Sequence, residues 1–156
     1  MVLVRSLTAE DVPSFMAWRG GDAYMAEIAR GHLADHDEGR RILFVAVDGS
    51  AVIGTLQLVL RSDDPALADG QTCAYLEALD VREPYRRRGV ATRLVESAGV
   101  AAASRGFRRL TVEVEPDNAP SLGLFERLGF SCFKRGTWVW RGQAYPTLCL
   151  ERALPV

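Results

Sequence analysis

The sequence predicts a mixed α/β (α+β) domain, in which runs of strands are interrupted by helices. Apolar runs of strand length alternate with segments whose apolar residues recur at helical spacing. The expected order is one strand, two helices, three strands, one helix, one strand, one helix and two strands. With 156 residues, of which 48% are hydrophobic and 25% charged, the chain suits one soluble globular domain, 1–156.

The amino-terminal part is expected to begin with a strand over residues 2–7. Thr8 then has the character of a helix N-cap, because acidic residues follow it and Phe15 belongs to an apolar stripe. A second helix is expected over residues 23–33.

A β-hairpin is expected next. Asp48-Gly49 is a strong short-range hairpin signal, and it separates apolar runs at 42–47 and 51–60. Residues 62–70 are polar and are expected to form a loop before the next strand at 73–81.

The second half contains two helices, each followed by strands. Gly106 and Gly129 stand where helix C-caps belong, and Asp117 or Asn118 suits the N-cap of the later helix. The expected elements are a helix from Val90 to the cap, a strand at 110–114, a helix from about 118 to 129, and strands at 130–140 and 145–150.

Charge and cysteine use exclude several classes of function. The net charge of −1 implies no general affinity for nucleic acid or membranes, and neither a leader nor a membrane-spanning run is recognised, so a cytoplasmic protein is expected. His32 and His36 are expected in a solvated loop, with no metal site because no third ligand is suggested. Cys73, Cys132 and Cys149 are expected to be buried free thiols.

Arg86, Arg87 and Arg88 stand at the start of the helix that begins near Val90. Cations are disfavoured there, because the first turn exposes unpaired N–H groups and the positive end of the helix dipole. An anion such as a phosphate would use both the guanidinium and the N–H groups, and Gly89 would let the backbone approach it. A solvated basic turn is the alternative.

Two motifs together resemble the GNAT superfamily of N-acetyltransferases. The first is Arg86-x-x-Gly89-x-Ala91 at a strand-to-helix turn, and the second is Asn118-Ala119-Pro120-Ser121-Leu122-x-Leu124-Phe125-x-x-x-Gly129-Phe130 after one more strand. The order of elements also matches, so the resemblance covers essentially the whole chain. It implies a mostly antiparallel sheet of six to seven strands with a V-shaped split, flanked by about four helices.

The resemblance implies a binding mode for acetyl-CoA, the acyl donor, in the split between the strand ending near Val81 and the next strand. Backbone groups around Leu79 and Val81 would bond the pantetheine arm and the acetyl carbonyl. The amides of Arg87, Arg88, Gly89, Val90 and Ala91 would hold the pyrophosphate, helped by the arginine side chains, including Arg86. Asn118 would contact the pantetheine arm or a water, or it is a plain helix cap, and both readings stay open.

Transfer to an amine requires a base, since an ammonium group has no lone pair. Glu77 is the first candidate because it stands in an apolar strand, where burial favours the neutral form of a carboxyl group. Asp80 is the second, after an expected bulge, and Glu113 and Glu115 are the third. A carboxylate on a solvated strand face is the alternative reading of Glu77.

Phe125 departs from the family pattern. Many relatives have a tyrosine here that protonates the leaving thiolate, whereas phenylalanine has no proton to give. Water or the backbone could take this role, with Tyr75 and Tyr145 as weaker substitutes, and Phe125 is expected to wall the thioester end of the donor.

The resulting hypothesis is an acetyl-CoA-dependent N-acetyltransferase working by direct attack of a primary amine. No cysteine has a nucleophile context. The acceptor, a small molecule or peptide, is expected beside the first two helices and the final hairpin, where Trp138, Trp140 and Tyr145 could form an aromatic wall. The alternatives are a non-catalytic acyl-CoA-binding module on the same fold and a nucleotide-binding protein. A homodimer through sheet edges is compatible with the apolar carboxy-terminal strands.

Overall fold

The computed structural model describes residues 1–155 of the chain. It has seven strands, four α-helices and two short 3-10 helices within that range. In chain order they are β1 (Val2–Ser6), η1 (Ala9–Asp11), α1 (Val12–Arg19), α2 (Ala23–Asp37), β2 (Arg41–Asp48), β3 (Ala51–Val59), β4 (Cys73–Val81), η2 (Glu83–Tyr85), α3 (Val90–Ser104), β5 (Arg109–Val114), α4 (Ala119–Arg127), β6 (Ser131–Trp140) and β7 (Gln143–Ala153).

The strands follow the order β1-β2-β3-β4-β5-β7-β6 in one mixed sheet. The β4–β5 pair is parallel, whereas β1–β2, β2–β3, β5–β7 and β6–β7 are antiparallel. The predicted fold class, a mixed and mostly antiparallel sheet with four helices, is therefore confirmed. The chain forms two compact units, which are described separately below.

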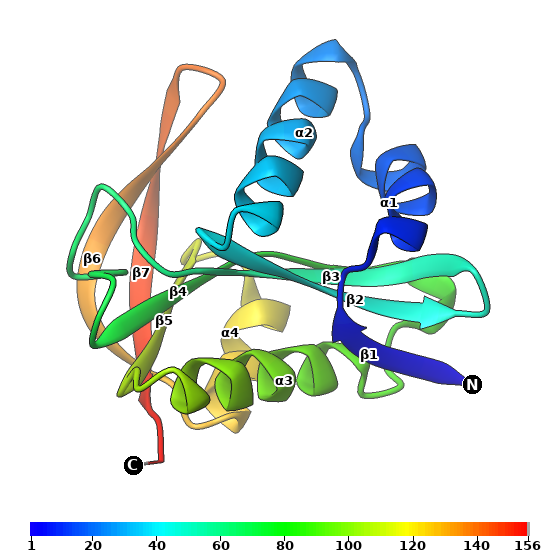
Figure 1. Cartoon of the computed structure of the whole chain (residues 1–156). Coiled ribbons are helices and arrows are strands. Elements are labelled where there is room, and N and C mark those ends of the chain that lie inside the picture. The colour runs from blue at the N-terminus through cyan, green and yellow to red at the C-terminus, as the bar shows by residue number, and fades with distance from the viewer. Residues whose placement is uncertain (156) are drawn as a thin grey trace. The chain divides into compact units, whose positions relative to one another are not determined.

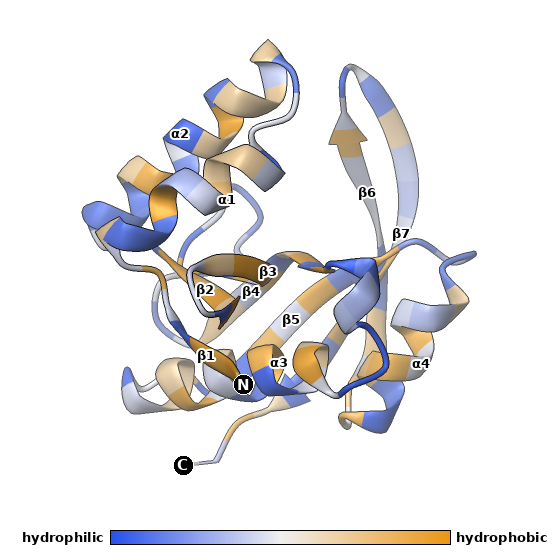
Figure 2. Cartoon of the chain, turned by 90° about the vertical axis from the view of Figure 1, so that its right-hand side faces the viewer, coloured by the Kyte–Doolittle hydropathy of each residue, from blue (hydrophilic) through white to orange (hydrophobic). Residues whose placement is uncertain are grey.

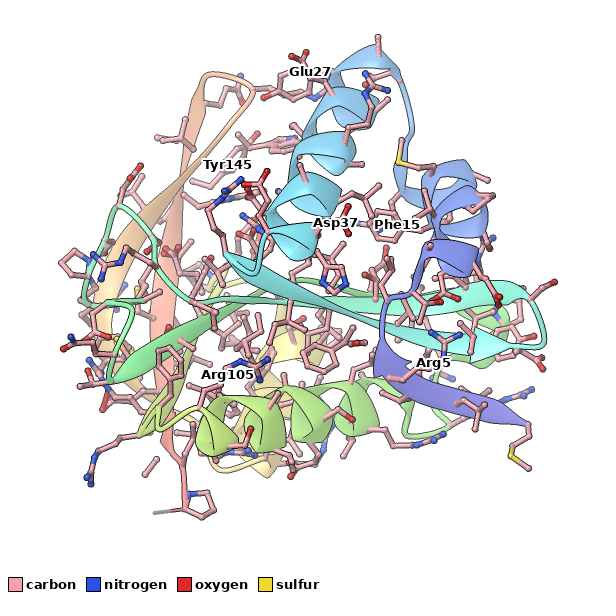
Figure 3. The ribbon with its side chains drawn as sticks, viewed as in Figure 1. Arg5, Phe15, Glu27, Asp37, Arg105 and Tyr145 are labelled. Atoms are coloured by element: carbon pink, nitrogen blue, oxygen red, sulfur yellow. The ribbon has the colours of Figure 1, made fainter. Side chains whose placement is uncertain are left out.

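The first unit comprises residues 1–59 and 78–100. Helices α1 and α2 cover one face of its strands, and Phe15 belongs with Leu43 to the core cluster beneath them (Figures 1 and 3). The opposite face carries the start of α3. A Cβ on Gly54 would lie only 3.3 Å from two side chains of that helix, so glycine permits their close approach. Figure 2 shows the apolar character of β2 and β3 that this double cover requires.

The second unit comprises residues 60–77 and 101–156. Its strand β5 lies between β4 and β7, and β6 completes the edge. Phe125 at the end of α4 packs edge-to-face on Phe130, with ring centroids 5.1 Å apart. The β5–β7 pairing stops at Val114 and Leu148, so residues 143–147 pair with β6 alone and form the outer part of a long hairpin (Figure 1).

Two expectations about side chains were wrong. His36 lies within α2, which runs four residues further than predicted, and its ring bonds the backbone: Nδ1 accepts from the N–H of Leu43 (3.0 Å), while Nε2 is 2.9 Å from the carbonyl oxygen of Leu7. It ties the end of α2 to β2 and to the residue that follows β1, which local sequence pattern does not reveal. Cys132 is exposed because it lies near the start of β6, which is an edge strand of the sheet. Cys73 and Cys149 are buried as expected.

No helix in residues 1–155 is both long and apolar enough to cross a membrane. In the same residues, no group of three or more His, Cys, Asp or Glu side chains is arranged to hold a metal ion.

Candidate active site

The arginine loop, residues 86–89, has the backbone of an anion-binding turn. Arg87 and Gly89 both have left-handed φ values, +64° and +77°, and α3 begins at Val90. Left-handed residues at a helix start turn successive N–H groups toward one side, where they can hold an anion. A Cβ at Gly89 would meet no protein atom within 4 Å, so this side of the loop is open. The first turn of α3 has no acidic residue that would compete with an anion.

The loop is anchored before it reaches the helix. Tyr85 donates from its hydroxyl to Asp48 in the β2–β3 turn (2.5 Å). Arg82 bonds β3 twice, from its backbone N–H to Ile53 O (2.8 Å) and from Nε to Val52 O (3.0 Å). These contacts fix the entrance of the loop on a rigid hairpin, which lowers the entropy lost when a ligand binds.

Arg86 turns back toward the end of β4. Its Nε donates to Val81 O (2.7 Å), and its Nη2 lies 3.5 Å from Asp80. The other oxygen of Asp80 accepts from Arg19 Nη1 of α1 (2.6 Å). Asp80, the second candidate base, therefore holds two arginines, and Arg86 contributes to the loop through its backbone and through this anchorage.

The strand that precedes the loop is kinked at Ala78, which has φ of +57°. Its parallel register with β5 runs from Cys73 to Leu76 and stops there, although β4 continues to Val81. A non-glycine residue in the left-handed region costs about 1–3 kcal/mol and marks a place where the backbone is re-aimed. The strand is therefore re-aimed directly ahead of Leu79 and Val81, at the place where a bulge before Asp80 is expected.

Glu77, the first candidate base, is half-buried and immediately precedes the kink. The neighbouring Tyr75 is buried, and burial together with the charges of Glu113 and Glu77 raises the pKa of its phenol. The charges of Glu77 and Glu113 therefore both contribute to the raised pKa of Tyr75, and all three residues belong to the second unit. Of the acidic candidates, Glu77 stands directly before the kink, whereas Asp80, two residues beyond it, binds two arginines.

Glu113 is the centre of a hydrogen-bonded cluster. It accepts from the hydroxyl groups of Tyr75 (3.1 Å) and Thr147 (2.6 Å). A Cβ at Gly136 would come within 3.1 Å of the same carboxylate and within 3.0 Å of Thr147 Oγ1, so glycine makes room for the cluster. Glu113 is therefore fixed in position by the sheet around it.

The hydroxyl groups of both tyrosines considered as proton donors already donate hydrogen bonds within the protein. Tyr75 donates to Glu113, and its raised pKa makes it hold its proton. Tyr145 donates to Gln143 Oε1 (3.0 Å) on the same strand. Phe125 is 2% exposed and packed on Phe130, as expected for a core residue. Asn118 caps α4 by accepting from the N–H of Ser121 (3.3 Å), and its contact with the donor stays a prediction.

Several contributors were absent from the sequence analysis. Arg19, Arg82 and Thr147 act through partners far away in the chain, and no local pattern identifies them. Gly136 left a usable signal, because a glycine inside a strand often marks a close approach of other groups.

Comparisons with known proteins agree on one family. Residues 5–130 match the model of the Acetyltransferase (GNAT) family. The N-alpha-acetyltransferase 30 of Schizosaccharomyces pombe is 32% identical over 111 residues, which cover 66% of this chain and 71% of that protein. The aminoglycoside N(6')-acetyltransferase type 1 of Salmonella typhimurium is 28% identical over 103 residues, covering 64% and 71%.

Solved structures show the same fold at lower identity. The ribosomal-protein-S18-alanine N-acetyltransferase from Escherichia coli matches with a TM-score of 0.76 and 17% identity, over 100% of this chain and 96% of that one. Arabidopsis thaliana NAA60, solved in complex with acetyl-CoA, matches with a TM-score of 0.73 and 19% identity over 98% of each chain.

Proposed function

The chain belongs to the GNAT family of acetyltransferases and is an acetyl-CoA-dependent N-acetyltransferase, and we propose that its acceptor is the α-amino group of a peptide or protein. The resemblance read from the two sequence motifs is thereby confirmed at the level of the family. The acceptor proposal is supported by the relatives named N-alpha-acetyltransferase, including one from Arabidopsis thaliana that is 43% identical over 61 residues.

The arginine loop is the observation that carries the donor half of this proposal. Its left-handed Arg87 and Gly89 and the open space over Gly89 suit the pyrophosphate of acetyl-CoA. A phosphate there would be bonded by N–H groups of a loop that Tyr85 and Arg82 already hold in place. The backbone of Leu79 and Val81 is proposed to bond the pantetheine arm and the acetyl carbonyl, as the family resemblance implies.

The proposed reaction is one direct transfer. The amine nitrogen, deprotonated by Glu77 directly or through water, attacks the thioester carbonyl, the C–S bond breaks as the C–N bond forms, and the nitrogen loses its second proton to solvent. Backbone N–H groups beyond the Ala78 kink would stabilise the developing oxyanion. The products are the acetylated amine and CoA. Because Tyr75 and Tyr145 are engaged and Phe125 has no hydroxyl, we propose that solvent protonates the CoA thiolate.

A competing base is Glu113, since it is also a fixed carboxylate of the same unit. Glu77 is preferred because it immediately precedes the Ala78 kink, beyond which the acetyl carbonyl is proposed to be bound. Comparing Glu77→Gln with Glu113→Gln therefore separates the two assignments.

The experiment that tests the function measures CoA release with a panel of peptides that have free amino termini, their N-blocked counterparts and an aminoglycoside. Free peptides should release CoA and blocked ones should not. If the aminoglycoside alone is acetylated, the acceptor is an aminoglycoside, as the name of the Salmonella relative states for that protein. Tight binding of acetyl-CoA without turnover of any amine would support the non-catalytic acyl-CoA-binding alternative, which the comparisons do not favour.

The remaining parts of the proposal concern the whole chain. We propose that residues 1–156 act as a single domain and that the protein works in the cytoplasm, with acetyl-CoA as donor and without a metal. A homodimer through sheet edges is retained as a proposal, and sedimentation analysis of the purified protein tests it.

A further inference from the structure

One face of the second unit joins the Glu113 cluster to the tip of the β6–β7 hairpin. Residues that pair across strands share a face, and so do residues two apart along a strand. Glu113 is opposite Cys149, Gly136 is opposite Thr147, and Trp138 is opposite Tyr145. The same face therefore runs from the anchored carboxylate outward along the hairpin.

The outer part of this face is an aromatic ladder, which we define as Trp138, Trp140 and Tyr145. The two tryptophan rings stack with centroids 5.6 Å apart and planes 13° from parallel, and the ring of Tyr145 lies 5.9 Å from that of Trp138. Trp138 remains 38% exposed, although it is flanked by two rings. The ladder lies where β7 has no β5 partner, and Figure 3 labels Tyr145 on this part of the hairpin.

The two ends of the face differ in charge. The inner end has Glu113, and Tyr75 beside it also senses the charge of Glu77. The hairpin itself, from Ser131 to Thr147, has three cationic side chains and no acidic one: Lys134 lies at the inner end and pairs with Asp64 (2.8 Å), Arg135 alternates to the opposite face, and Arg141 lies at the tip. One of them, Arg141, lies over the Trp140 ring at the tip, 5.7 Å from its centroid. Along this face, an inner end with Glu113 and the Lys134–Asp64 ion pair is thus followed by the aromatic ladder and then by the cationic Arg141 at the tip.

From this order we infer that the face binds an extended acceptor peptide whose amino terminus lies at Glu113, whose third side chain is aromatic or large and apolar, and which is acidic further on. The inference rests on the proposed function. An ammonium group complements the carboxylate, a ring complements the exposed ladder, and a carboxylate complements the cationic tip. It names Trp138 as the residue that determines specificity beyond the reacting amine.

The position of the selected residue follows from strand geometry. Thr147, which bonds Glu113, and Tyr145 are two residues apart, or about 7 Å along β7. An extended peptide advances by about 3.3 Å per residue, so its third residue reaches the ladder when its first lies at Glu113. Arg141 follows Gly136, the partner of Thr147, by five residues along β6, or about 16 Å, which corresponds to the sixth residue of the peptide.

The test uses heptapeptides that begin with Ala-Ser and differ at the third residue, Phe or Ser, and at the sixth, Glu or Lys. The peptide with Phe and Glu should have the highest kcat/KM, about tenfold above its Ser counterpart, because the ring is partly desolvated on the ladder. Trp138→Ala should bring the Phe-to-Ser ratio close to one, and Trp138→Phe should keep most of it. Val139→Ala is the matched control, since Val139 is 65% exposed and alternates to the opposite face of the same strand.

Thermal melting and acetyl-CoA binding of each variant confirm that the fold is kept. Equal turnover of the Phe and Ser peptides by the wild-type protein overturns the inference while leaving the proposed function intact, and so does a Phe-to-Ser ratio that survives Trp138→Ala. Absence of acetylation of every peptide overturns both. A wild-type dimer that Trp138→Ala converts to a monomer would assign the ladder to a second copy of the chain and also overturn the inference.

Discussion

Gly89→Ala should separate the stability of the arginine loop from its affinity for acetyl-CoA. Gly89 has φ of +77°, so a Cβ is strained there by about 1–2 kcal/mol. It would nevertheless meet no protein atom within 4 Å, so no clash adds to this cost. The loss of folding stability should therefore stay near the strain alone.

The effect on the donor should be larger. The Cβ would occupy the open side of the loop where the pyrophosphate is proposed to lie, and would displace at least one charge-assisted hydrogen bond worth about 1.5–3 kcal/mol. This corresponds to a rise in Kd for acetyl-CoA of about ten- to a hundredfold. Titration calorimetry measures the Kd, and thermal unfolding measures the strain.

Gly106→Ala is the matched control. Gly106 follows the other end of α3, has φ of +87° and would also place a Cβ in open space. It should cost similar stability with no change in Kd. If both variants bind acetyl-CoA as the wild type does, the pyrophosphate does not approach Gly89 and the donor site must be reassigned.

Three further predictions concern acidic residues. Glu77→Gln should lower kcat about a hundredfold or more with an unchanged Kd for acetyl-CoA, and a kcat equal to the wild type from about pH 6 to about pH 9 would exclude Glu77 as the base. Asp80→Asn should raise the Kd for acetyl-CoA about three- to tenfold, because Arg86 and Arg19 lose their anchor; the pH profile of kcat should not move, and a shifted profile would return Asp80 to the base role. Hydrogen bonding by Arg5 lowers the pKa of the buried Asp11, so its carboxylate stabilises the fold above its ordinary pKa of about 4, and this stability is lost as pH falls through the lower folded-state value. Asp11→Asn should accordingly cost about 2 kcal/mol at pH 7 and progressively less as the pH falls below the ordinary pKa of about 4, as measured by urea unfolding; a cost that does not change with pH would contradict the role of this ion pair.

The sequence predicted the elements whose signals are local. β4 was predicted with its observed bounds, Cys73–Val81, because a mainly apolar run is bounded by polar residues on both sides. The Asp48-Gly49 turn and the glycine after α3 were found for the same reason, since each combines a turn residue with a change of periodicity. The arginine loop was found because three cations at a helix start conflict with local electrostatics.

What the sequence could not predict depends on tertiary contacts. Arg86 was expected to face an anion, yet its side chain turns to Val81 O and Asp80, and only the folded chain brings Arg19 to the same carboxylate. The anchorage of Glu113 joins β4, β5 and β7, whose residues are more than thirty positions apart. Hydrophobic pattern places such side chains on a face but does not choose their partners.

The central claim is direct transfer of an acetyl group from acetyl-CoA to a peptide α-amine. Acetyl-CoA labelled in the acetyl group should be mixed with excess enzyme and a free-amine peptide, and both peptide and protein should be examined by mass spectrometry through a single turnover. The account predicts label on the peptide α-nitrogen, one CoA released per acetyl group transferred, and no labelled protein at any time. Label that appears first on the protein, or CoA released without an acetylated peptide, would contradict it.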